Sequence, residues 1–159
     1  MTTTATTEHT LILERVFDAE PERVFRAWTE PEILKKWFAP KPFTTPKAEL
    51  DVRPGGRSLI VMRDPEGNDY PNVGVYLHIE PGRRLVSTDA YREAWVPSER
   101  PFMTMDLRFD PLPGGKTKAT YVVSHWTKEA YDQHVQMGFH EGWGICAEQL
   151  AELLASGEA

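Results

Sequence analysis

The sequence predicts an α+β domain in which a curved antiparallel sheet of six or seven strands wraps around a long C-terminal helix. Three observations lead to this prediction. Apolar runs of strand length alternate with turn clusters through the middle of the chain, two short helical patterns follow the first strand, and a long amphipathic pattern ends the sequence. A helix with one apolar face needs a wide partner, and the sheet is the only wide element available.

The first strand is predicted in "TLILERVFDA", where apolar and β-branched residues partly alternate with polar ones. The pattern then becomes helical, because Pro21 suits the first turn of a helix and apolar residues recur at helical spacing as far as Thr29. A second short helix follows Pro31 and is ended by Pro40 and Pro42, since proline cannot continue a helix.

A meander of antiparallel strands is predicted between Phe43 and Trp126. The turn clusters "RPGGR", "DPEGND", "EPGRR" and "PLPGGK" separate its strands. The stretch "FMTMDLRF" alternates cleanly, so one face of that strand should be buried and the other wet. The predicted strands are "KAELDV", "SLIVM", "NVGVYLHIE", "RLVSTDAYREAW", "FMTMDLRF" and "KATYVVSHW".

The last helix is predicted to run from a Thr127 cap to about Leu154. It contains three glycines in "MGFHEGWGIC", each of which costs a helix about 1 kcal/mol relative to alanine. Gly138 and Gly142 flank the apolar stripe, where they would either leave room for a strand or a ligand, or kink the helix; Gly144 faces outward and is not explained. The stripe consists of Val135, Phe139, Trp143, Cys146, Leu150 and Leu153.

Composition limits the possible classes of protein. The 159 residues suffice for one domain, expected at residues 10–156 after a disordered tail at 1–9. A formal net charge of -6 and a pI near 5.4 argue against binding to nucleic acid or to anionic membranes. The single cysteine cannot form an internal disulfide, and no leader peptide or membrane-spanning run is visible. We therefore expect a soluble cytoplasmic protein.

The sequence contains no motif for catalysis, for a metal or for a cofactor, so no metal or cofactor is expected. None of the histidines forms an HExxH pattern or an i, i+4 pair. Cys146 lies in the apolar stripe, where a thiol has a raised pKa and behaves as a small hydrophobe. There is no GxSxG motif, and the glycine pairs at 55–56 and 114–115 are predicted to be turns.

Four phrases occur in a specific order: "RVFDAEPERVFRAWTEPEILKKWFAP", "ELDVRPGGR", "EGNDYPNVGVYLHIEPGRRLVSTD" and "GWGICAEQLAELLA". In that order they resemble the START-like, helix-grip superfamily (SRPBCC, Bet v1-like), and within it the bacterial relatives of the C-terminal domain of the Hsp90 ATPase activator. The resemblance extends from about Thr10 to Ala155. It implies a seven-stranded sheet that grips the long helix, with an apolar cavity between them and the two short helices at its mouth.

The resemblance, together with the tryptophan and methionine content, predicts a protein that binds an apolar small molecule or a lipid. One alternative is a cyclase or dehydratase type of enzyme, which would need two titratable side chains within hydrogen-bond reach in the cavity. Another is an interaction with an Hsp90-type chaperone, which is disfavoured because the eukaryotic activator carries an additional N-terminal domain. The sequence leaves open whether the protein is a monomer or a homodimer, and whether side chains fill the cavity.

The candidate ligand-binding residues are of two kinds, and no catalytic residue is assigned. Polar groups that could orient a ligand's oxygen, or act as acid or base, are Tyr76, Tyr91, His125 and His134. Shape and apolar area would come from Trp37, Phe38, Met62, Met105, Trp126, Val135, Phe139, Gly142 and Trp143.

Overall fold

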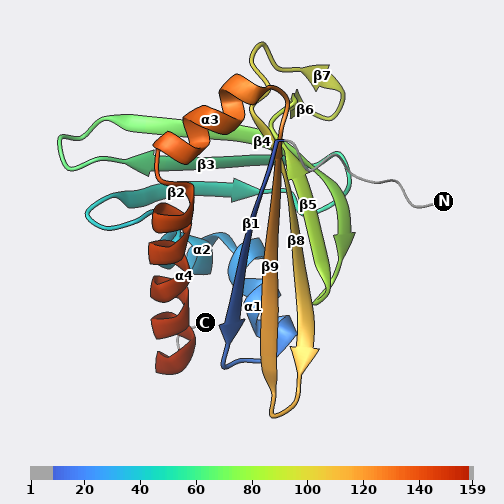
Figure 1. Cartoon of the computed structure of the whole chain (residues 1–159), viewed down its shortest axis with the longest axis vertical. Helices are drawn as coiled ribbons and strands as arrows, with labels where there is room; N and C mark the ends of the chain where they lie inside the picture. Colours follow the sequence, from blue (N-terminus) through green and yellow to red (C-terminus); the bar gives the residue numbers. More distant parts are fainter. Residues whose placement is uncertain (1–8, 158–159) are drawn as a thin grey trace.

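The main sheet confirms the predicted α+β class. The structure, a computed structural model, describes residues 9–157. Seven strands form one antiparallel sheet in the order β1-β9-β8-β5-β4-β3-β2 (Figure 1). The tail expected at residues 1–9 lies, apart from His9, outside the described residues. The strands are β1 Thr10–Phe17, β2 Thr44–Leu50, β3 Arg57–Arg63, β4 Asp69–Glu80, β5 Arg84–Thr88, β8 Met103–Leu112 and β9 Lys116–His125.

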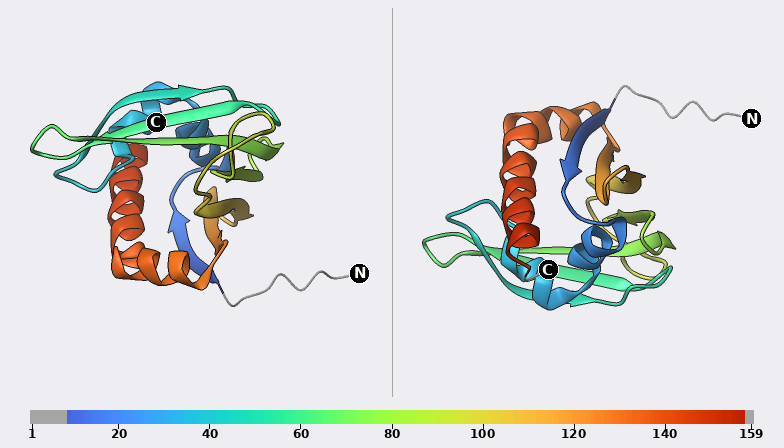
Figure 2. Two further views of the ribbon diagram at one scale, coloured as in Figure 1. Left: turned by 90° about the horizontal axis from the view of Figure 1, so that it is seen from above. Right: turned by 90° about the horizontal axis from the view of Figure 1, so that it is seen from below.

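The helices lie at two places in the chain, α1 and α2 between β1 and β2, and α3 and α4 after β9. Figure 2 shows that the curved sheet and the α3–α4 pair enclose the interior from opposite sides. In the part of the chain that the structure describes, no helix is both long enough and apolar enough to span a membrane. The helices are α1 Pro21–Thr29, α2 Pro31–Trp37, α3 Lys128–Gln136 and α4 Phe139–Ser156.

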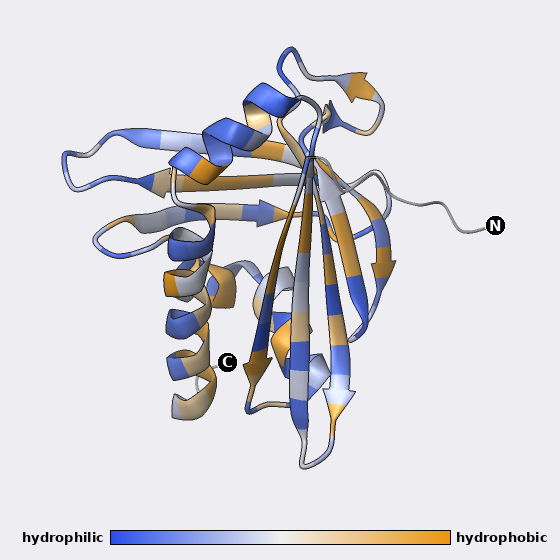
Figure 3. Ribbon diagram, in the orientation of Figure 1, coloured by the Kyte–Doolittle hydropathy of each residue, from blue (hydrophilic) through white to orange (hydrophobic). Residues whose placement is uncertain are grey.

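The alternation predicted for β8 is confirmed, and β9 shows the same pattern. Leu107 and Phe109 of β8 are buried, and so are Tyr121 and Val123 of β9, while the residue between each pair is more exposed. The two strands therefore carry alternating hydrophobic and hydrophilic bands in Figure 3. Because successive side chains point to opposite faces, the buried set forms the inner face of the sheet.

The prediction of one continuous C-terminal helix is wrong, because Gly138 divides it into α3 and α4. Thr127 does cap α3, since its Oγ1 accepts a hydrogen bond from the Ala130 N–H at 3.0 Å. At Gly138 φ is +84°, a left-handed conformation that costs other residues about 1–2 kcal/mol. The chain turns there, and Val135 consequently faces solvent instead of extending the apolar stripe.

Gln149 anchors the C-terminal half of α4 to the segment after α2. Its Nε2 donates to the carbonyls of Trp37 and Ala39, each at 2.9 Å. Its Oε1 accepts from the Lys41 N–H at 3.1 Å. Apolar packing reinforces this attachment, because this half of α4 also supplies the buried core residues Leu150 and Leu154, and the buried Ala147 directly precedes it.

The stretch predicted as one strand, "RLVSTDAYREAW", is divided after Thr88. The Asp89 carboxylate accepts hydrogen bonds from the N–H groups of Phe102 at 2.7 Å and Met103 at 3.1 Å. The chain then leaves the main sheet, and β6 (Tyr91–Glu93) pairs with β7 (Val96–Pro97) in a separate two-stranded sheet. A side-chain hydrogen bond to the backbone thus competes with the strand ladder at this point.

The two glycine positions should respond in opposite ways to alanine. Gly138→Ala should lower the free energy of unfolding by about 1 kcal/mol or more, because the turn needs a positive φ. Gly144→Ala should raise it by about 0.5–1 kcal/mol, because Gly144 is inside α4 and no atom lies within 4 Å of an added Cβ. Urea unfolding measures both, and equal effects would contradict the assigned turn.

Candidate ligand-binding pocket

A pocket of about 520 Å³ lies between the central strands of the sheet and the C-terminal helices. Its walls come from β3, β4, β5 and β8, from α2 and the residues after it, and from the turn between α3 and α4. α4 lines it only with its N-terminal half, through Phe139, Gly142, Trp143 and Cys146. Sites for small molecules usually have volumes of about 300–1,000 Å³, so this pocket is large enough for one.

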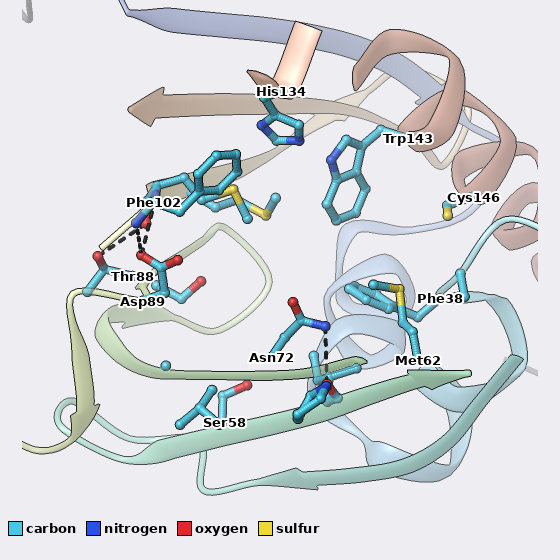
Figure 4. A pocket seen from close by; sticks show the side chains of 18 of the residues that line it. Phe38, Ser58, Met62, Asn72, Thr88, Asp89, Phe102, His134, Trp143 and Cys146 are labelled. Carbon is cyan, nitrogen blue, oxygen red and sulfur yellow. Dashed lines mark hydrogen bonds between the residues drawn. The ribbon is translucent and has the colours of Figure 1, made fainter. Parts of the chain in front are cut away.

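Aromatic side chains close one end of the pocket. Trp28, Phe38 and Trp143 line it and contact one another, with ring centroids between 5.6 and 6.0 Å apart. Met62 and Cys146 lie at the same end (Figure 4). This end therefore presents mainly apolar and polarisable surface, which suits an aromatic or aliphatic guest.

The opposite end carries polar groups around Phe102 (Figure 4). Asp89 lies there with one carboxylate oxygen committed to the backbone N–H groups of Phe102 and Met103. Burial raises the pKa of Asp89, and these hydrogen bonds oppose that shift. The exposed residues Arg92 and Arg100 also belong to the lining. The pocket is thus asymmetric, with an apolar end and a polar end.

Two histidines meet at the polar end. His125 Nε2 and His134 Nδ1 are 2.8 Å apart, and His125 Nδ1 is 2.8 Å from the His9 carbonyl oxygen. The His134 ring also contacts Phe102 and Phe139, at centroid distances of 5.1 and 4.9 Å. Burial, and secondly the neighbouring His125, lower the pKa of His134 to about 4. His134 is therefore neutral at physiological pH.

Two other titratable groups of the lining, Tyr76 and Cys146, are also uncharged at neutral pH. Burial raises the pKa of Tyr76 to about 12, although the Ser58 hydroxyl at hydrogen-bond distance opposes the shift. Burial raises the pKa of the Cys146 thiol to about 12 as well, as predicted for its place in the apolar stripe. Within residues 9–157, no three His, Cys, Asp or Glu side chains are grouped to hold a metal ion.

Most of the predicted site residues lie in the lining of the pocket. They come from the segment after α2, from three strands and from both C-terminal helices. Gly142 has open space beside it, since no atom lies within 4 Å of a Cβ built there. The predicted residues in the lining are Phe38, Met62, Tyr76, Met105, His134, Phe139, Gly142 and Trp143.

Two predicted residues lie just behind the lining. Trp37 is buried against α1, where its Nε1 donates to the Ala27 carbonyl at 3.1 Å, because α2 directs this face toward α1. His125 is buried behind His134, which separates it from the pocket. Both residues therefore support the wall and do not form its surface.

Three further predicted residues lie away from the pocket. Tyr91 is on β6, where its ring packs against the exposed Trp95 at a centroid distance of 5.6 Å. Trp126 is 54% exposed in the connection between β9 and α3. Val135 is 48% exposed because the turn at Gly138 ends the helical phase that placed it on the stripe.

The lining also contains residues that the sequence does not predict as site residues, among them Trp28, Asn72, Asp89 and Phe102. Trp28 lies on the buried face of α1, and that face reaches the pocket. Asp89 lies in a segment that the sequence predicts as strand. The turn that brings its carboxylate to the backbone was therefore not predicted. Asn72 is a single polar residue near the start of a strand, and no local pattern marks it.

His134 should make the fold less stable in acid. Its pKa is about 4 in the folded protein against 6.5 as the ordinary value, so between these pH values the unfolded chain binds more protons. The free energy of unfolding should therefore fall as the pH is lowered from about 6.5 to about 4. In the His134→Phe variant, the fall in the free energy of unfolding over this pH range should be smaller than in the unaltered protein, by on the order of 1–2 kcal/mol. Urea unfolding across the range tests this, and parallel losses in both proteins would refute it.

The solved structures of bacterial proteins include close matches to this fold. Protein NE0264 from Nitrosomonas europaea is 40% identical in sequence with a TM-score of 0.91, over 96% of this chain and 98% of that chain. Protein CV1439 from Chromobacterium violaceum is 30% identical with a TM-score of 0.75, over 91% and 96% of the two chains. Protein Ms6760 from Mycobacterium smegmatis is 28% identical with a TM-score of 0.78, over 92% and 91%.

Sequence comparison assigns the family. No match was found among the curated proteins. Residues 18–155 match the family described as "Activator of Hsp90 ATPase homolog 1-like protein". This range contains the whole pocket lining and all the helices described above except the last residue of α4. The chain therefore belongs to the family of activator of Hsp90 ATPase homolog 1-like proteins, as the START-like resemblance of its sequence indicated.

Proposed function

We propose that this protein binds an apolar small molecule or a lipid in the pocket between the sheet and the C-terminal helices. The observation that carries the proposal is the pocket itself, about 520 Å³ in volume with a wall built largely of aromatic, aliphatic and methionine side chains. Binding sites for apolar ligands have this size and composition. The unbranched side chains of Met62, Met103 and Met105 can adapt to the shape of a guest.

Gly142 gives further support. A glycine inside a helix costs about 1 kcal/mol relative to alanine, and the turn of α4 at Gly142 has no positive φ that would require it. A Cβ at this position would meet no atom within 4 Å. Close packing against the sheet therefore does not explain the glycine. Retaining open volume beside Trp143 does explain it.

A cytoplasmic location without a nucleic-acid partner accompanies this proposal. The chain's single cysteine is free and buried, which fits a reducing compartment. The net charge of -6 fits a small neutral ligand better than a polyanion. Binding of this kind requires neither a metal nor a cofactor.

An acid–base enzyme of cyclase or dehydratase type is the second candidate, and one observation favours it. His125 and His134 are titratable side chains within hydrogen-bond reach of each other at the pocket. The lowered pKa of His134 nevertheless makes it a weak base near neutral pH, and the raised pKa of Tyr76 makes it a weak acid. Binding a ligand requires no proton transfer to His134 or from Tyr76. We therefore prefer ligand binding to catalysis as the proposed function.

Native mass spectrometry of gently purified protein, followed by solvent extraction, tests for a bound molecule. The expected result is a stoichiometric apolar passenger that is identified after extraction. In a second assay, N-phenylnaphthylamine, a neutral dye that fluoresces in apolar surroundings, should bind the emptied protein. Absence of a passenger together with absence of dye binding would contradict the proposal.

A matched pair of variants should place the dye in the pocket. Gly142→Leu fills open space in the lining and should weaken dye binding by about tenfold or more, because the added side chain occupies ligand volume. Gly144→Leu adds the same side chain two positions later, outside the lining, and should change the affinity by less than about twofold. Equal affinities of the two variants would place the dye elsewhere.

A further inference from the structure

The histidine pair has a defined arrangement of protons. A carbonyl oxygen only accepts hydrogen bonds, so the contact of 2.8 Å between His125 Nδ1 and the His9 carbonyl requires a proton on Nδ1. In a neutral imidazole the other nitrogen is then bare. His125 Nε2 is therefore an acceptor.

The same reasoning extends to His134. Its Nδ1 lies 2.8 Å from the bare His125 Nε2, so this Nδ1 carries the proton and donates it. His134 Nε2 is consequently bare and accepts hydrogen bonds. The His9 carbonyl lies at the other end of this hydrogen-bonded chain from the pocket. It thus determines that His134 presents an acceptor, and not a donor, to the pocket.

His134 Nε2 is placed to meet a ligand. Figure 4 shows the His134 ring pointing into the pocket between Phe102 and Trp143, and Nε2 is at the far end of the ring from the helix. Among the described residues no hydrogen-bond partner is found for this atom, while Nδ1 is occupied by His125. Besides His125, the rings that contact His134 are those of Phe102 and Phe139, and neither offers a donor side chain.

A second acceptor lies on the opposite wall. The Asn72 amide nitrogen donates to the carbonyls of Ile60 at 3.3 Å and Tyr70 at 3.1 Å. Both partners are acceptors, so the amide must present its nitrogen to them and its oxygen elsewhere. The Thr88 hydroxyl, in contrast, is already used, because it donates to the Met103 carbonyl and accepts from the Ala90 N–H.

We propose that the ligand is a neutral apolar molecule with a hydroxyl group, an alcohol or a phenol, which donates a hydrogen bond to His134 Nε2. This inference rests on the proposed function and specifies its ligand class. The apolar body would lie along Trp143 and Phe38, and the hydroxyl would lie at the polar end near Phe102. A buried acceptor left without a donor loses stability, so a molecule without a hydroxyl binds less well.

A carboxylate would fit this end of the pocket poorly. The bare nitrogen of His134, the amide oxygen of Asn72 and the carboxylate of Asp89 all present lone pairs. The arginines that could attract an anion, Arg92 and Arg100, are exposed in solvent, where ion pairs contribute little. The electrostatics of this end therefore favour a ligand with a neutral hydrogen-bond donor over a ligand with a carboxylate.

Competition against N-phenylnaphthylamine tests the inference with three probes that share one ring system: naphthol, methoxynaphthalene and naphthalene. Methoxynaphthalene keeps the oxygen but lacks the donor, and naphthalene controls for the bulk of the methyl group. Naphthol should bind about three- to tenfold more tightly than either of the others. In His134→Phe, which keeps a ring but has no acceptor, the three affinities should agree within about twofold.

The nitrogen chemical shifts of the histidine rings, measured by NMR on the unaltered protein, provide a second readout that needs no variant to fold. They should show His134 protonated at Nδ1 and bare at Nε2. A protonated Nε2, or equal affinity for naphthol and methoxynaphthalene, would overturn the inference and leave the proposed function intact. Failure of every probe and of the dye to bind would overturn the proposed function and the inference with it.

Discussion

The three hydrogen bonds of the Gln149 amide decide how α4 lies over the sheet. They fix the helix to the segment after α2 at a point where Ala147, Leu150 and Leu154 already fill the core. The N-terminal half of α4 also contacts the sheet, since His140 Nε2 lies 3.2 Å from the Ile12 carbonyl oxygen of β1. The same half lines the pocket through Phe139, Gly142 and Trp143. The anchored end of the helix thus fills the core, and the other end borders open space.

The turn at Gly138 completes the enclosure. Without it, α3 would continue in line with α4 and carry His134 away from the sheet. With it, α3 crosses toward the end of β9, where His125 ends the strand and receives the hydrogen bond from His134. A backbone conformation accessible to glycine therefore sets the chemistry of the polar end of the pocket.

Local patterns in the sequence predict most of the fold but only part of the site. The prolines that begin α1 and α2, and the alternation along β8, act within a few residues, so they are readable from the sequence alone. The sequence does not determine the role of the glycines in the C-terminal helical pattern, because a missing side chain indicates either open space or a turn. Gly142 illustrates the first and Gly138 the second. The meeting of His125 with His134 combines a strand end, a connection and a helix turn, and neither the strand period nor the helix period predicts it.

The composition of α3 has a consequence for how relatives of this protein can diverge. His134 is the only buried residue of this helix, and the rest of its surface is half-exposed or exposed. Substitutions in α3 therefore disturb few core contacts, yet they lie beside the polar end of the pocket. Natural variation can exchange the chemistry of this wall while β8, β9 and the anchored half of α4 keep the fold. Preference for one guest over another can thus change over generations at a small cost in stability.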